Sequence, residues 1–265
     1  MILIDIIVSS YFHKGNFIDL SQNRQKWRAQ PILHPGQYYS VFCLHTLWEH
    51  ARVKKLIGDQ DRDAKYFSIV REPVDLFVSF WDYYGYSAAF KMDLDTFATE
   101  NIAAYNRNQT LLDSQKKFKH NYNMLIDFGL TGGSLRDESA VAAKIAQIEA
   151  DFDLIMVTEQ FDESLVLLRD LLCWDWGDMT YFKLNSWQDT ERSKLSSEGR
   201  ASLKTWLWGD YMLYQHFKKR FDKAVRTYNG NMEKDLNFLR SMNKVTQEYC
   251  VEVSFMLSYY FKLVL

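Results

Sequence analysis

One stretch, residues 65–86, constrains the fold of this 265-residue chain more than any other. Its sequence, KYFSIVREPVDLFVSFWDYYGY, begins with an apolar run at 66–70, breaks at Arg71-Glu72-Pro73 and continues as a long aromatic-rich run. Pro73 lacks an N–H and has a preset φ, so it suits the first turn of a helix and favours extended geometry just before it. The stretch therefore predicts a buried strand, a tight turn and a buried helix.

Two polar side chains of this stretch are candidates for binding a phosphate. Arg71 follows the expected strand, and open α/β sheets bind ligands at the carboxyl ends of their strands. Ser79 lies about two turns into the expected helix, at ~3.6 residues per turn. An arginine beside a helix N-terminus offers a phosphate a planar cation and a positive dipole end. The structural alternative is that Arg71 pairs with a nearby carboxylate and that Ser79 is a small polar residue of the core.

The rest of the chain alternates strands with helices, which predicts an α/β fold with a mainly parallel sheet covered by many helices. Right-handed crossovers place His45, at the end of an expected strand, at the same sheet edge as Arg71. Ser196 or Ser197 is expected to cap a long helical region that reaches about Tyr228. Further strands are expected at 38–45, 153–158 and 181–184, and further helices at 138–150 and 231–248.

Two other groups of residues have both a functional and a structural interpretation. Trp81, Tyr83 and Tyr84 have rings that can stack on adenine or a sugar, but aromatic runs more often belong to the core. His216 lies in an amphipathic helical stretch, LYQHF, and is flanked by the apolar stripe, which favours a structural role.

Charge and cysteine spacing limit the classes of partner. A net charge of -2 argues against a general nucleic-acid binder. Cys43, Cys173 and Cys250 are far apart and show no zinc-ligand spacing, so no metal is expected. One disulfide with one free thiol and three buried thiols both remain open.

Length and composition fit one large domain, which we expect to cover residues 1–250. The remaining residues, 251–265, form an apolar tail that is shorter than the roughly 20 residues of a membrane span, and we expect it to be packed or interfacial. Asn108 begins an Asn-Gln-Thr sequon, so it is a candidate glycosylation site in a secretory lumen.

Four blocks of the sequence resemble the galactose-3-O-sulfotransferase family, which includes the galactosylceramide sulfotransferases. They are YFSIVREPVDLFVSFWDYYG at 66–85, MLIDFGL at 124–130, EQFDESLVLLRDLLCWDWGDMTYFKLN at 159–185 and LSSEGRASLKTWLWGDYMLYQHFKKRF at 195–221. The likeness runs from about residue 5 to residue 250.

The resemblance implies a sulfotransferase fold related to nucleotide kinases and the donor 3′-phosphoadenosine 5′-phosphosulfate. It implies an acceptor with a terminal galactose, on a glycolipid such as galactosylceramide or on a glycan, and a type II protein on the lumenal face of the Golgi membrane. Arg71 and Ser79 resemble the family's pair for the donor's 3′-phosphate. His45 resembles a histidine that the family carries before this strand, and it is the candidate for acid–base chemistry or acceptor contact.

The chain departs from the family pattern at its start. The family's first strand and its Lys/Thr/Ser-rich 5′-phosphosulfate loop are missing, as is the membrane anchor, so we expect a family member truncated at the N-terminus. A catalytically inactive relative that keeps only the nucleotide 3′-phosphate site is the alternative. A nucleotide kinase of other chemistry is disfavoured, because the sequence has no GxxxxGK[ST] motif.

Overall fold

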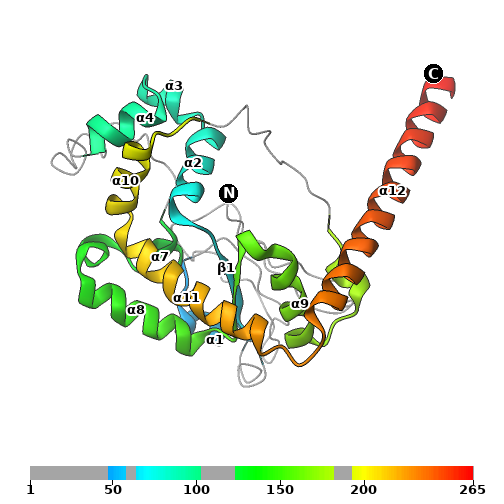
Figure 1. Ribbon diagram of the computed structural model, residues 1–265, viewed down its shortest axis with the longest axis horizontal. Coiled ribbons are helices and arrows are strands. Elements are labelled where there is room, and N and C mark those ends of the chain that lie inside the picture. Colours follow the sequence, from blue (N-terminus) through cyan, green and yellow to red (C-terminus); the bar gives the residue numbers. More distant parts are fainter. Residues whose placement is uncertain (1–46, 58–63, 103–122, 182–192, 265) are drawn as a thin grey trace. The chain divides into compact units, whose positions relative to one another are not determined.

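The computed structural model describes residues 47–57, 64–102, 123–181 and 193–264 (Figure 1). The chain divides into two compact units. The first combines Met1–Glu159 with Trp187–Lys219, and the second combines Gln160–Ser186 with Arg220–Leu265. The expected division into residues 1–250 and a tail at 251–265 stays a prediction.

The first unit contains a parallel pair of strands. β1 (Phe67–Val70) pairs with β2 (Leu154–Val157), so that the first residues of the two strands lie opposite each other, as do the last. Their residues are largely buried, which fits the apolar sequence of each strand. The parallel pairing expected from the sequence is therefore confirmed at these two strands. The strand expected at 38–45 and residues 182–184 of the one expected at 181–184 lie outside the described residues.

The helix expected after Pro73 is confirmed as α2 (Pro73–Tyr83). Pro73 is its first residue, and the side chain of Glu72 accepts a hydrogen bond from the backbone N–H of Asp75 at 2.7 Å. Gly85 adopts a left-handed conformation with φ 61°, which a glycine accepts without strain, and α3 (Tyr86–Phe90) begins there.

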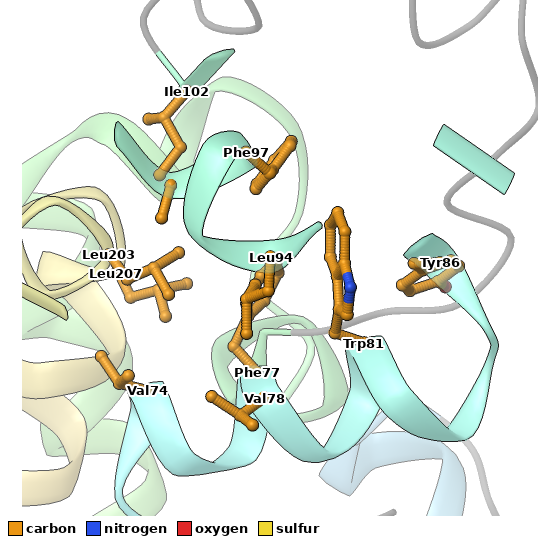
Figure 2. Close-up of a cluster of buried hydrophobic side chains, with 11 residues drawn as sticks. Val74, Phe77, Val78, Trp81, Tyr86, Leu94, Phe97, Ile102, Leu203 and Leu207 are labelled. Carbon is orange, nitrogen blue, oxygen red and sulfur yellow. The ribbon is translucent and has the colours of Figure 1, made fainter. Parts of the chain in front are cut away.

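The buried face of α2 forms the aromatic core of the first unit (Figure 2). The rings of Phe77 and Phe97 stack with their centroids 6.0 Å apart, and Trp81 lies 5.1 Å from Phe97. The partner elements are the short helix α4 (Leu94–Thr96), the π-helical turn Phe97–Asn101 and α10 (Ser197–Trp206), which lies beside α2 (Figure 1). The buried members of this core are Val74, Phe77, Val78, Trp81, Tyr86, Leu94, Phe97, Ala98, Ile102, Leu203 and Leu207.

The helical region expected from residue 196 to about 228 is confirmed, and it consists of two helices. Ser196 caps α10, since its hydroxyl accepts from the N–H of Gly199 at 3.0 Å, as the sequence predicted. The helix ends at the buried Leu207, and α11 (Trp208–Arg226) follows. Only Leu207 separates the two helices, and helical hydrogen bonds continue on both sides of it, from the Leu207 N–H to Leu203 and from the Tyr211 N–H to Leu207. The side chain of Leu207 belongs to the buried core around α2.

The helix expected at 138–150 is confirmed as α8 (Glu138–Asp151). The last helix is longer than expected, because α12 (Met232–Val264) continues past residue 248 and no glycine or proline interrupts the sequence after Gly230. Across the described part of the chain, no helix is long and apolar enough to span a membrane. The remaining elements are α1 (His50–Ile57), α7 (Met124–Asp127), α9 (Phe161–Leu172) and 3₁₀ turns at Gly132–Arg136, Thr158–Gln160 and Trp176–Met179.

A buried carboxylate joins α11 to α7 in the first unit. Asp210 is fully buried, and its two oxygens accept the backbone N–H groups of Met124 and Leu125 at 3.1 and 3.0 Å. Burial raises the pKa of Asp210 from 3.8 to about 7, with a smaller contribution from the charge of Asp127, although the two backbone donors act in the opposite direction. In the folded protein the protonated form of Asp210 therefore predominates below about pH 7, whereas in the unfolded chain it does so only below about pH 3.8.

We expect the Asp210→Asn variant to gain stability relative to the wild type as the pH rises. Because the folded pKa lies above the unfolded one, the contribution of Asp210 is fully present below pH 3.8 and is lost as the pH rises through about 7. The difference between the two free energies of unfolding is expected to move by on the order of 4 kcal/mol over that range. Urea unfolding across the pH range measures it, and parallel profiles for the two proteins would contradict the assignment.

A second prediction concerns the aromatic core. Truncating the fully buried Phe77 to alanine leaves a cavity beside Trp81 and Phe97 and should cost about 3–5 kcal/mol in the free energy of unfolding. The control is Tyr83→Ala on the same helix, where the side chain is 52% exposed and the expected cost is within about 1 kcal/mol. Similar losses in both variants, measured by chemical denaturation, would be inconsistent with this core.

Candidate functional site

The candidate site lies where β1 and β2 end. Because the strands are parallel and in register, with Val70 opposite Val157, both carboxyl ends lie at one edge. Arg71 follows β1 directly, and Thr158 and Glu159 follow β2. This edge is the place where open parallel sheets bind their ligands.

The structure places both predicted phosphate ligands on one strand–turn–helix unit. Arg71 is half-buried at the end of β1, and Ser79 lies on the half-exposed side of α2 together with Asp75 and Asp82. The other two predicted site residues, His45 and Asn108, lie outside the described residues.

The first turn of α2 is already occupied by a carboxylate of the protein. Glu72 accepts from the N–H of Asp75, and the hydroxyl of Tyr211 on α11 donates to Glu72. Burial raises the pKa of Glu72, while the Asp75 N–H and the Arg200 guanidinium, 3.9 Å away, act in the opposite direction. The Asp75 N–H is therefore not available to a phosphate bound by Arg71. This differs from the expectation that the N-terminus of the helix would help to bind the phosphate.

A short segment around the start of α10 runs along the polar side of α2. Arg200 donates to Asp75 at 2.9 Å. Ser193 donates from both its amide and its hydroxyl to Asp82. Ser79 therefore lies, along α2, between two carboxylates that are each bound to this segment.

Two tyrosines of α11 bind the carboxylates that follow the strands. Tyr211 donates to Glu72 after β1, and Tyr214, about one turn further along the helix, donates to Glu159 after β2 at 3.3 Å. Sequence reasoning missed both tyrosines, Glu159 and Arg200. No local motif marks them, because their partners lie 55 to 139 residues away in the sequence.

The aromatic residues of α2 divide between core and surface. Trp81 is fully buried, and its indole N–H donates to the hydroxyl of Ser87 at 2.7 Å, so it is a core residue. Tyr84 stacks on Phe80 with ring centroids 5.5 Å apart. Tyr83 is 52% exposed, so of the three rings it is the one available to a ligand.

Two histidines lie in polar clusters away from the end of β1. His50 and Trp48 both hydrogen-bond the carboxylate of Asp151, at 2.9 and 2.8 Å. The ring of His50 lies 5.3 Å from that of Tyr66, which precedes β1, so this cluster is at the opposite end of the strands from Arg71. His216 lies 3.0 Å from Glu149 in a surface pair, which fits the structural role expected for it.

The described residues contain no group of three or more His, Cys, Asp or Glu side chains able to hold a metal ion. Cys173 is an exposed free thiol in a left-handed conformation at the end of α9. The expectation that the protein binds no metal stays a prediction.

Comparison with known proteins identifies the family. A model of the galactose-3-O-sulfotransferase family matches residues 28–259. Galactose-3-O-sulfotransferase 2 of Sus scrofa is 32% identical over 82% of this chain and 54% of its own length. Galactosylceramide sulfotransferase of Mus musculus is 30% identical over 82% and 51%, and galactose-3-O-sulfotransferase 3 of Mus musculus is 34% identical over 79% and 49%.

The chain spans about half of the length of the curated relatives it matches. No solved structure is significantly similar to it. The match of the family model covers most of the chain, including the strand–turn–helix unit that carries Arg71 and Ser79. The chain therefore belongs to the galactose-3-O-sulfotransferase family.

Proposed function

We propose that this protein transfers a sulfuryl group from 3′-phosphoadenosine 5′-phosphosulfate to the 3-hydroxyl of a terminal galactose. The observation that supports this most directly is the position of Arg71, half-buried at the carboxyl end of β1, with Ser79 on the helix that follows. Membership of the galactose-3-O-sulfotransferase family supports the reaction and the donor.

In this proposal Arg71 and Ser79 bind the 3′-phosphate of the donor. A guanidinium presents two parallel N–H groups to a phosphate, and a serine hydroxyl adds a neutral donor. The carboxylates of Glu72 and Asp75 near this point have other partners: Tyr211 donates to the first and Arg200 to the second. The positive charge of Arg200 offsets part of the repulsion that a bound phosphate would meet from these carboxylates.

The acceptor side of the proposal rests on the names of the relatives. One of them is a galactosylceramide sulfotransferase and others are galactose-3-O-sulfotransferases, so we propose a glycolipid or glycan that ends in galactose. His45 is proposed to contact the acceptor hydroxyl or to take its proton. We also propose that the protein works at the lumenal face of the Golgi membrane, where Asn108 would be available for glycosylation.

The donor site is tested by titration calorimetry with adenosine 3′,5′-bisphosphate. Loss of the charged hydrogen bonds in Arg71→Ala should weaken binding by about 10- to 100-fold, and Ser79→Ala should weaken it by about tenfold or less. Asp153→Ala, an exposed change at the opposite end of the strands, serves as the control and should bind like the wild type. Equal binding by wild type and Arg71→Ala, or no binding by either, would overturn the assignment of Arg71.

Transfer itself needs a second measurement, with labelled donor and galactose-terminated glycolipids and glycans as acceptors. Sulfation at the galactose 3-hydroxyl supports the proposed reaction. Binding of the bisphosphate without any transfer would instead support a catalytically inactive relative that keeps the 3′-phosphate site.

A further inference from the structure

The two residues that follow β2 bind the peptide groups on either side of Arg71. The hydroxyl of Thr158 donates to the carbonyl oxygen of Val70 at 3.1 Å, and that carbonyl belongs to the peptide before Arg71. The carboxylate of Glu159 accepts from the N–H of Glu72 at 2.7 Å, and that N–H belongs to the peptide after Arg71. The peptide groups on both sides of Arg71 are therefore hydrogen-bonded to the side chains of two consecutive residues, Thr158 and Glu159.

These two bonds occur where regular sheet pairing stops. The ladder between the strands ends at Val70 and Val157, and the chain turns into α2 at Pro73. Main-chain polar groups beyond a ladder still need partners. Here the side chains of the two residues after β2 supply them, so the end of β1 stays attached to the neighbouring chain segment after the ladder has ended.

Glu159 is itself held by a second element. Its other carboxylate oxygen accepts from the hydroxyl of Tyr214 on α11 at 3.3 Å. Tyr211, about one turn before it on the same helix, donates to Glu72. Helix α11 therefore contacts Glu72, the residue after Arg71, in two ways. Tyr211 binds its side chain directly, and Tyr214 binds Glu159, which accepts from its backbone N–H.

We propose that Thr158 and Glu159 are positioning residues for the donor: they fix the backbone from which Arg71 reaches the 3′-phosphate. This inference rests on the proposed role of Arg71 in donor binding. Fixing the backbone of Arg71 should strengthen phosphate binding, because an arginine with a fixed backbone loses less conformational freedom when it binds.

The charge of Glu159 makes a positioning role distinguishable from a purely electrostatic effect, because the two predict opposite changes in affinity when Glu159 is removed. Glu159 is negatively charged, so its field alone opposes the binding of a phosphate at Arg71, and removing it should tighten binding. Positioning predicts the opposite result, namely that removal of Glu159 weakens binding although a repulsive charge has gone.

The test compares two nucleotides by calorimetry on the full chain. Adenosine 3′,5′-bisphosphate has the 3′-phosphate, and adenosine 5′-monophosphate lacks it. Glu159→Ala should weaken binding of the bisphosphate by about tenfold, because one hydrogen bond that positions Arg71 is lost. The affinity for the monophosphate should not change. Glu159→Gln keeps an oxygen that accepts from the Glu72 N–H and should bind within about threefold of the wild type, and Thr158→Val should fall between the two.

The chain offers a matched control at the other end of the strands. Asp153 is also exposed, and its carboxylate accepts from a backbone N–H, that of Tyr66, at 2.9 Å. Asp153→Ala removes the same kind of bond and should lower the thermal midpoint as Glu159→Ala does, without changing the affinity for the bisphosphate.

A double variant completes the test. If Glu159 acts through Arg71, Glu159→Ala should cause no further loss of affinity when Arg71 is already alanine. A wild type that does not prefer the bisphosphate over the monophosphate would refute the proposed donor site itself. If that preference is present and depends on Arg71, but Glu159→Ala binds the bisphosphate as well as the wild type or better, the positioning role is wrong and the donor site stands.

Discussion

Parallel pairing of β1 with β2 is the interaction on which the candidate site depends. It brings two chain segments, separated by more than eighty residues, to one edge, where Arg71 follows one strand and Thr158 and Glu159 follow the other. The aromatic core behind α2 then fixes the helix that carries Ser79. Without this pairing, the peptides next to Arg71 would have neither the hydroxyl nor the carboxylate that now binds them.

The site proposed to bind the donor's phosphate also contains several carboxylates. Each of the nearby acidic side chains has a specific partner: Tyr211 donates to Glu72, Arg200 to Asp75 and Tyr214 to Glu159. These acidic groups form hydrogen bonds that hold the strand ends, α2, α10 and α11 together. This structural role of the carboxylates is consistent with the proposal that Arg71 binds the donor.

Local sequence rules predicted the elements around Arg71 well, for identifiable reasons. Pro73 marks the start of α2, Ser196 marks the start of α10, and the apolar runs mark both strands. They did not predict that the helical region after Ser196 divides at Leu207 into α10 and α11. They also did not predict that α12 would continue through its apolar end.

The sequence by itself determined the family, the strand–turn–helix unit and the two residues proposed to bind the 3′-phosphate. Backbone chemistry explains why: Pro73 and the apolar pattern act over neighbouring residues, so their effects can be read locally. Only the tertiary structure placed Glu159 on the peptide after Arg71 and Tyr214 on Glu159. Those bonds join residues that are distant in the chain, and the parallel register and the packing of α11 bring them into contact.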